Sequence, residues 1–496
     1  MAIVPTGYYS RSYVIRQLGD MRDQLDALQR QLATGKRAET NAALGAERNL
    51  SLVYRQQTAE ISSYLQTIDL ADTRLKVIAA TLTRITGVGT EAKGALDPNI
   101  FLLQTDGKST GQQAATNYLQ ELVALFNADV ADRRIFAGKA VDVTPVEKIA
   151  VLFDGEGNKA GLRQLVAERR AADLGADGLG RLIVPAVAGD TVTLSQEADG
   201  LPFGFELRSV TSNLNGAALG GPSGSPPSIS IGLTAQPQSG QTVSVELGLP
   251  DGTSHTITLT ASLEGGPGQF ALGATVTETA ENLRAALVGA LERAGQTALA
   301  AASALRASTE FFASGGNPAL RVDGPPFETA TALRTATDTD TIAWYKGDNS
   351  PGDPRADSLA RVDKTITIAY GLRANEPGFA AIVANLAALI ADDFSGGTDA
   401  DSGRSSELTR RVRVNLESNT RSVNATSMEI AGAQIALNQA RERLTATRSM
   451  LMELTEKVEG VDVHETSVSL LSLQSRIQAS YEATAILFKL NLADYL

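Results

Sequence analysis

The chain contains no cysteine, one tryptophan and two histidines among its 496 residues. Without cysteine it has neither a disulfide framework nor a thiolate metal site. Aromatic residues make up only 5% of the chain, although 43% of it is apolar, which favours aliphatic and alanine-rich contacts between helices over bulky globular cores. A chain of this length can bury several cores, so we expect two to four domains.

A basic surface and a long apolar run are also missing. The formal net charge is −12, so we expect no nucleic-acid partner, because phosphate binding requires clustered cations. No run approaches the roughly 18 apolar residues of a membrane span, so no membrane partner is expected. The opening MAIVPTGYYSRSYVIRQ lacks the basic region and apolar stretch of a cleaved signal. If the protein leaves the cell, we expect a route that does not read such a signal.

What the chain does have is heptad spacing near its N-terminus. Apolar residues at alternating steps of four and three predict a first helix with the packing positions Val14, Leu18, Met21, Leu25, Leu28 and Leu32. The next position is Gly35, which has no side chain to pack and favours a left-handed cap, so the helix is predicted to end there. Thr40 or Asn41 is predicted to cap a second helix. Its seam runs from Leu50 to Ile85 and includes Ile61, Ile68, Leu75 and Leu82.

The C-terminal part carries a matching seam. Apolar residues stand at every seventh position, and these are Leu416, Val423, Ile430, Leu437, Leu444, Leu451 and Val458. An apolar stripe of this kind is stable only when a partner covers it, so we predict that residues near 50–85 pair with residues near 408–458. A last stripe consists of Leu470, Leu473, Ile477, Tyr481, Phe488, Leu492, Tyr495 and Leu496. In a monomer its only expected partner is the first helix.

The predicted fold is therefore a mainly α rod of long antiparallel coiled-coil-like helices from both chain ends, with inserted α+β domains in the middle. We assign residues 1–40 to an inner helix, 41–150 to the N-terminal half of the rod, 151–400 to the inserted part, 401–460 to the C-terminal half of the rod and 461–496 to a second inner helix. Within 41–150, we predict a helix near 115–126 and a short strand with a turn at 133–139.

The central part changes in character. Residues 213–228 are rich in Gly, Pro and Ser and predict a loop. Val243 to Leu259 alternate around Pro250-Asp251-Gly252, which predicts a hairpin. Thr275 and Glu278 have the spacing of a capping box before a helix, and residues 380–390 predict an apolar helix. We expect re-entry into the rod near residue 400.

Residues that carry chemistry are scarce. His255 and His464 are interpreted as solvated polar residues, because no second histidine or cysteine stands at metal spacing. Asp106 to Thr110 resembles the end of a phosphate loop, but the motif requires glycine where Leu102 stands. Trp344 and Tyr345 are interpreted as a core aromatic pair, the alternative being a ligand platform. We expect no enzymatic activity, no cofactor and no metal.

Three stretches carry a family resemblance. LDALQRQLATGKR, followed by YLQTIDLADTRLKVIAATLTRI, resembles the N-terminal region of bacterial flagellins and flagellar hook-associated proteins. IFAGKAVDVTPV and the ending ASYEATAILFKLNLADYL are similar to elements of the hook-filament junction family, the third hook-associated protein. The resemblance covers the two ends of the chain only. It departs from the family pattern at residues 41–45, where the family commonly has a Ser/Pro-Asp-Asp-like element, so the local turn is in doubt.

The resemblance implies a structural adaptor of the bacterial flagellum, self-associated in a ring between the first hook-associated protein and flagellin. It implies an extracellular location at the hook-filament junction, type III export, an export chaperone at the C-terminal helix and terminal helices packed in the core of the axial structure. The alternative within the superfamily is a flagellin that forms the filament itself. From another class, the central domains could bind glycans or carry an activity.

Overall fold

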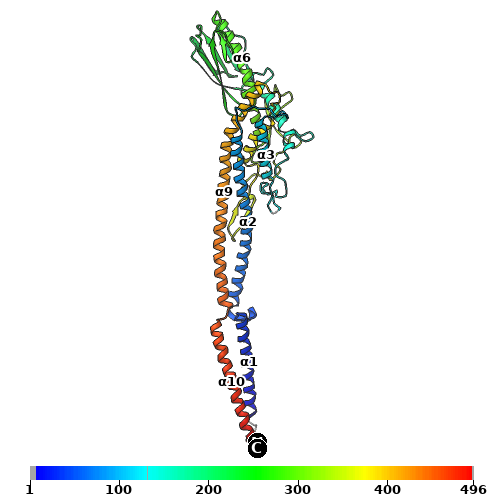
Figure 1. The fold of residues 1–496 in the computed structure, drawn as a ribbon, viewed down its shortest axis with the longest axis vertical. Coiled ribbons are helices and arrows are strands. Elements are labelled where there is room, and N and C mark those ends of the chain that lie inside the picture. The colour runs from blue at the N-terminus through cyan, green and yellow to red at the C-terminus, as the bar shows by residue number, and fades with distance from the viewer. Residues whose placement is uncertain (1–6, 131, 494–496) are drawn as a thin grey trace. The chain divides into compact units, whose positions relative to one another are not determined.

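The computed structural model of the chain describes residues 7–130 and 132–493, and it describes side chains within 13–130 and 132–486. The fold is about 53% helical, with long helices toward the C-terminus and small β-sheets formed by the middle of the sequence. Figure 1 shows the helices and strands along the chain. Among the described residues, 7–71, 361–367 and 435–493 form a first compact unit, and 72–130, 132–360 and 368–434 form a second.

The first unit contains the terminal helices α1 (Gly7–Thr34) and α10 (Val463–Ala493), which lie side by side (Figure 1). The predicted end of the first helix is confirmed, because α1 ends at Thr34 and Gly35 has φ +68°. The predicted cap is wrong. Thr40 precedes a short 3₁₀ helix, η1 (Asn41–Glu47), without a side-chain cap bond, and the long helix α2 (Arg48–Ala95) begins seven residues later than expected.

The long helices α2 and α9 (Asp399–Glu459) contribute to both units. In the first unit, Arg441 Nη2 lies 3.0 Å from Asp69 Oδ1. In the second, Lys93 Nζ lies 2.8 Å from Glu417 Oε2. The predicted seam residues that are buried are Ile61, Ile68, Leu75, Leu82, Leu416, Val423, Ile430, Leu437, Leu444 and Leu451. Val458 is half-buried.

The start of the α2 seam differs from the prediction. Leu50 is 47% exposed and Gln57 is exposed. Ser51 and Arg55, which occupy neighbouring positions on the helix, instead bond Glu459 of α9. A polar contact therefore replaces the apolar seam in the first turns of α2.

The second unit contains two four-stranded sheets. Their orders are β1-β2-β5-β4 and β3-β6-β7-β8, and the pairs are antiparallel except for β7 with β8. The strands are β1 (Leu182–Ile183), β2 (Thr191–Gln196), β3 (Glu206–Ser212), β4 (Ala217–Ser223), β5 (Ser228–Leu233), β6 (Thr242–Gly248), β7 (Ser254–Ser262) and β8 (Gln269–Ala271). The predicted hairpin is confirmed as β6 and β7.

A helical run packs into the same core as these sheets. It consists of α6 (Val276–Ala294), a π-helical turn η2 (Gly295–Leu299) and α7 (Ala300–Phe311). The Thr275 side chain accepts from the Glu278 amide, as a capping box requires, but Glu278 Oε2 accepts from the Ala274 amide rather than from that of Thr275. The predicted helix start is therefore confirmed with the reciprocal bond displaced by one residue.

A cluster of three phenylalanines lies among the remaining elements of the chain. Phe126, Phe136 and Phe379 pack with ring centroids 5.3–5.7 Å apart. The elements are α3 (Thr110–Phe126), α4 (Ile149–Asp154), α5 (Leu162–Leu174), β9 (Leu320–Val322), β10 (Leu333–Thr335), η3 (Pro354–Asp357), β11 (Leu359–Arg361), β12 (Thr367–Ala369) and α8 (Pro377–Ala391). The predicted helices at 115–126 and 380–390 and the helix start near 400 are confirmed.

Two predictions for this unit are wrong. Residues 133–139 form only single bridges, from Arg134 to Asp129 and from Ala137 to Arg373, and no strand. Residues 213–228 contain β4, which pairs with β5. A Cβ atom at Gly220 would lie 2.6 Å from Ser230 Oγ, so the missing side chain permits the close approach of this strand.

Candidate functional site at the terminal helices

The first unit places the two terminal helices antiparallel to each other. The Val461 amide donates to the Gly35 carbonyl over 3.1 Å, and the Arg37 amide donates to the Glu459 carbonyl over 2.7 Å. Further along the pair, the Arg22 guanidinium lies 5.6 Å from the centroid of the Tyr481 ring. The break at Gly35 and the start of α10 therefore meet at one end of the helix pair.

The predicted packing positions differ in burial along this pair. Leu473 and Ile477 are each only 8% exposed. Leu32 and Tyr481 are exposed. Half-buried positions are Val14, Leu18, Met21, Leu25, Leu28 and Leu470. The side chains of Phe488, Leu492, Tyr495 and Leu496 lie outside the described part of the chain. The assembly role assigned to all of these residues remains a prediction.

A second apolar face of α10 was missed by the sequence reasoning. Val468, Leu471 and Ile486 are 67%, 62% and 58% exposed, and they lie away from the buried Leu473 and Ile477. The prediction considered one heptad stripe per helix, and these residues lie outside that stripe. The signal was present, because a helix that is apolar around most of its circumference is normally buried. The described part of the chain leaves this face uncovered.

A cluster of polar contacts near the end of α1, which we call the clamp, joins α2 to α9. Glu459 accepts hydrogen bonds from Ser51 Oγ and Arg55 Nε, each over 2.6 Å, and also pairs with Arg55 Nη2. The side chain of Glu459 is 10% exposed. The hydrogen bonds from Arg55 and Ser51 outweigh desolvation and lower the pKa of Glu459 to about 2.

Because the pKa of Glu459 is lower in the folded chain than in the unfolded chain, the clamp stabilises the fold above the unfolded pKa of about 4.3. That stabilisation is lost as the pH falls toward about 2. We expect the slope of unfolding free energy against pH between these values to be smaller in Glu459→Gln than in the wild type. Urea denaturation at a series of pH values measures this slope. Equal slopes would show that the clamp does not contribute.

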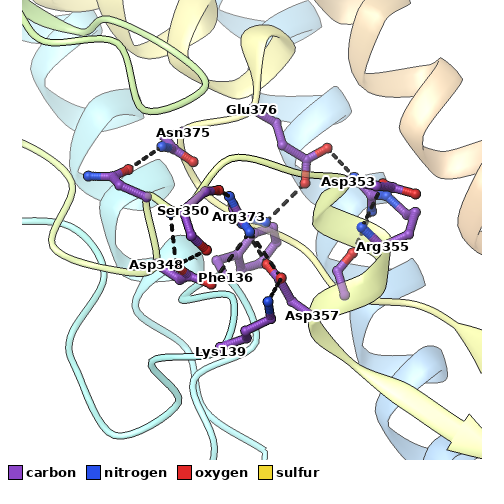
Figure 2. A network of polar contacts seen from close by, with 12 residues as sticks. Phe136, Lys139, Asp348, Ser350, Asp353, Arg355, Asp357, Arg373, Asn375 and Glu376 are labelled. Atoms are coloured by element: carbon purple, nitrogen blue, oxygen red, sulfur yellow. Dashed lines mark hydrogen bonds and ion pairs between the residues drawn. The ribbon is translucent and has the colours of Figure 1, made fainter.

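The second unit holds a buried ion-pair network, shown in Figure 2. Arg373 Nε and Nη2 donate to the two carboxylate oxygens of Asp357 over 2.5 and 3.0 Å. Its remaining nitrogen, Nη1, donates to the Ser350 carbonyl over 2.6 Å. Arg355 pairs with Glu376 beside it, and burial raises the pKa of the Glu376 carboxyl. Each of these carboxylates has a cationic partner, as a structural network requires.

The network also holds the segment for which a strand was predicted. The Gly138 amide donates to the Leu372 carbonyl over 3.1 Å, and the Asp348 amide donates to the Ala137 carbonyl over 3.0 Å. Lys139 Nζ lies 3.8 Å from Asp357 Oδ1. The segment is therefore fixed by the loop around Asp348 and by the residues before α8.

Other residues singled out in the sequence have structural surroundings. Trp344 and Tyr345 are buried, with ring centroids 5.9 Å apart, which confirms the core aromatic pair. Ser109 caps α3 in a complete capping box with Gln112. His464 is exposed as expected, but His255 is half-buried, and burial lowers its pKa.

Within residues 7–130 and 132–493, no group of three or more histidine, aspartate or glutamate side chains is arranged to hold a metal ion. In the same ranges, no helix combines the length and the apolar character that crossing a bilayer requires. No protein-family model and no curated protein matches the sequence.

Proposed function

We propose that the protein is a structural adaptor of the bacterial flagellum that joins a hook-associated ring to the flagellin filament. It assembles through its terminal helices after type III export, and an export chaperone covers α10 before assembly. Copies associate in a ring outside the cell, between the first hook-associated protein and flagellin. The resemblance of the two chain ends supports this proposal, with no catalytic residue or cofactor assigned.

The uncovered apolar face of α10 is the observation that carries the proposal. Exposed large apolar surfaces mark interaction sites in soluble proteins. Val468 and Leu471 lie on a helix whose opposite side already packs through Leu473 and Ile477. A helix with both faces apolar fits the interior of an assembly, where neighbouring copies cover the second face.

The proposed rod is the antiparallel pairing of α2 and α9. Support comes from the burial of Leu75, Leu416 and their seam neighbours, and from bonds between the two helices in each unit. In the second unit Gly89 allows a close approach, because a Cβ there would lie 2.7 Å from Thr420 Oγ1.

Electron microscopy of a null mutant tests the function. The adaptor proposal expects bare hooks and secreted, unassembled flagellin. Hooks bearing normal filaments would exclude it. If the chain is instead a flagellin, the purified protein should polymerise by itself into long filaments, whereas an adaptor should not.

Leu471→Asp should abolish incorporation into the axial structure while leaving the free energy of unfolding nearly unchanged, because Leu471 is 62% exposed in the free chain. Ser469→Asp places the same charge at an exposed position on another side of α10; it is the matched control and should incorporate far better. Immunogold labelling of flagella from complemented null cells gives the readout. Normal incorporation of Leu471→Asp would rule out this face as an assembly surface.

A further inference from the structure

A shallow hollow of about 210 Å³ lies in the second unit between the end of α2, the loop that follows it and the N-terminal part of α9. It is lined by Lys93, Pro98, Arg410, Arg413, Val414 and Glu417. Three of these six side chains are cations and one is an anion. The hollow is therefore locally basic in a chain whose net charge is −12.

The cations of the hollow differ in their partners. Lys93 pairs with Glu417 over 2.8 Å, and Arg410 pairs with Glu407 over 2.5 Å. Arg413 is half-buried and makes no hydrogen bond or ion pair within the described ranges of the chain. A guanidinium is always charged and presents donors that match both oxygens of a carboxylate. Arg413 is thus an unpaired guanidinium that can donate hydrogen bonds to an anionic group.

Apolar side chains stand beside this cation. Val414 in the hollow is 66% exposed, and Ile100 in the loop that carries Pro98 is 52% exposed. A free inorganic anion has no apolar part that could cover this surface. A peptide segment with a carboxylate and an apolar neighbour does, because apolar area gains free energy when it is removed from water.

We propose that this hollow docks an acidic segment of a second copy of this chain. Two copies with a charge of −12 repel each other, so a lateral contact between them requires a local cation opposite a carboxylate. Each copy has carboxylates in excess, since the sequence contains 56 acidic and 44 basic residues. The hollow supplies the unpaired guanidinium. This contact is separate from the terminal helices. It rests on the proposed function, in which it would join neighbouring copies of the ring.

The test uses the full chain in sedimentation equilibrium over a range of concentrations, at low and high sodium chloride. The wild type should self-associate, and salt should weaken the association, because exposed charges are screened. Arg413→Glu should raise the dissociation constant at least about tenfold, because it sets like charges against each other. Arg413→Gln should have a smaller effect.

Arg293→Glu is the matched control. Arg293 is an exposed arginine on α6 in the same unit, it forms no ion pair within the described ranges, and its replacement causes the same change of charge. It should associate like the wild type. Circular dichroism and thermal unfolding establish that all three variants are folded.

The proposal is overturned if Arg413→Glu associates like the wild type, or if the wild type stays monomeric at every concentration and salt. Inorganic phosphate that binds the wild type but not Arg413→Glu in calorimetry, without self-association, would make the hollow a small-anion site instead. Leu471→Asp should keep this association. Failure of the hollow therefore leaves the terminal-helix proposal intact, and the reverse also holds.

Discussion

Leu437→Asp is expected to reduce the free energy of unfolding by about 4 kcal/mol or more, because it removes a buried leucine and leaves an unpaired charge away from water. Leu437 is fully buried in the first unit. In this unit, α2 and α9 are joined by the Asp69–Arg441 and Arg55–Glu459 ion pairs. Hydrogen exchange should therefore speed up in residues 50–71 as well as in 435–458.

Ile435→Asp is the control for this substitution. Ile435 lies two residues earlier in α9, it is also aliphatic, and it is 59% exposed. Placing the same charge there should change the free energy of unfolding by less than about 0.5 kcal/mol. Faster exchange confined to 435–458 in Leu437→Asp would contradict the pairing of α2 with α9.

The contrast between Leu437 and Ile435 shows why the helices were predictable from sequence. Helical periodicity is local, so a run of apolar residues at steps of three and four marks which side is buried without knowledge of the partner. Gly35 could be assigned as a helix end on the same local grounds. The predicted start of the seam at Leu50 was wrong because a distant residue, Glu459, accepts hydrogen bonds from Ser51 and Arg55 at this end of α2.

Contacts between residues that are distant in the sequence explain why the other features were not predicted. Residues 217–223 are poor strand formers by composition, yet β4 exists because β5 offers it a partner and Gly220 permits close approach. The ion-pair network joins Lys139 to Asp348, Asp357 and Arg373, which lie in a distant part of the chain and share no regular spacing. The second apolar face of α10 could have been predicted from the sequence by examining every side of that one helix. The hollow at Arg413 could not, because it is formed by segments that only the fold brings together.

Arg373→Ala is expected to destabilise the second unit by about 3–5 kcal/mol, because it strands a buried carboxylate. The side chain of Asp357 is 1% exposed, and it would lose both bonds to the guanidinium, which lie at 2.5 and 3.0 Å. Lys139 at 3.8 Å is too distant to replace them. Urea denaturation followed by the fluorescence of Trp344, the only tryptophan, reports on the same unit.

Two further variants distinguish the effect of leaving the Asp357 carboxylate unpaired from the effect of losing side-chain packing. Arg163→Ala breaks a surface pair with Asp154, in which both side chains are at least 45% exposed, and it should cost about 1 kcal/mol or less. Arg373→Met combined with Asp357→Leu removes both charges and keeps much of the volume, so it should recover most of the stability lost in Arg373→Ala. A double variant as unstable as the single one would mean that the bonds from Arg373 to backbone and Asp348, rather than the pairing of Asp357, hold this region together.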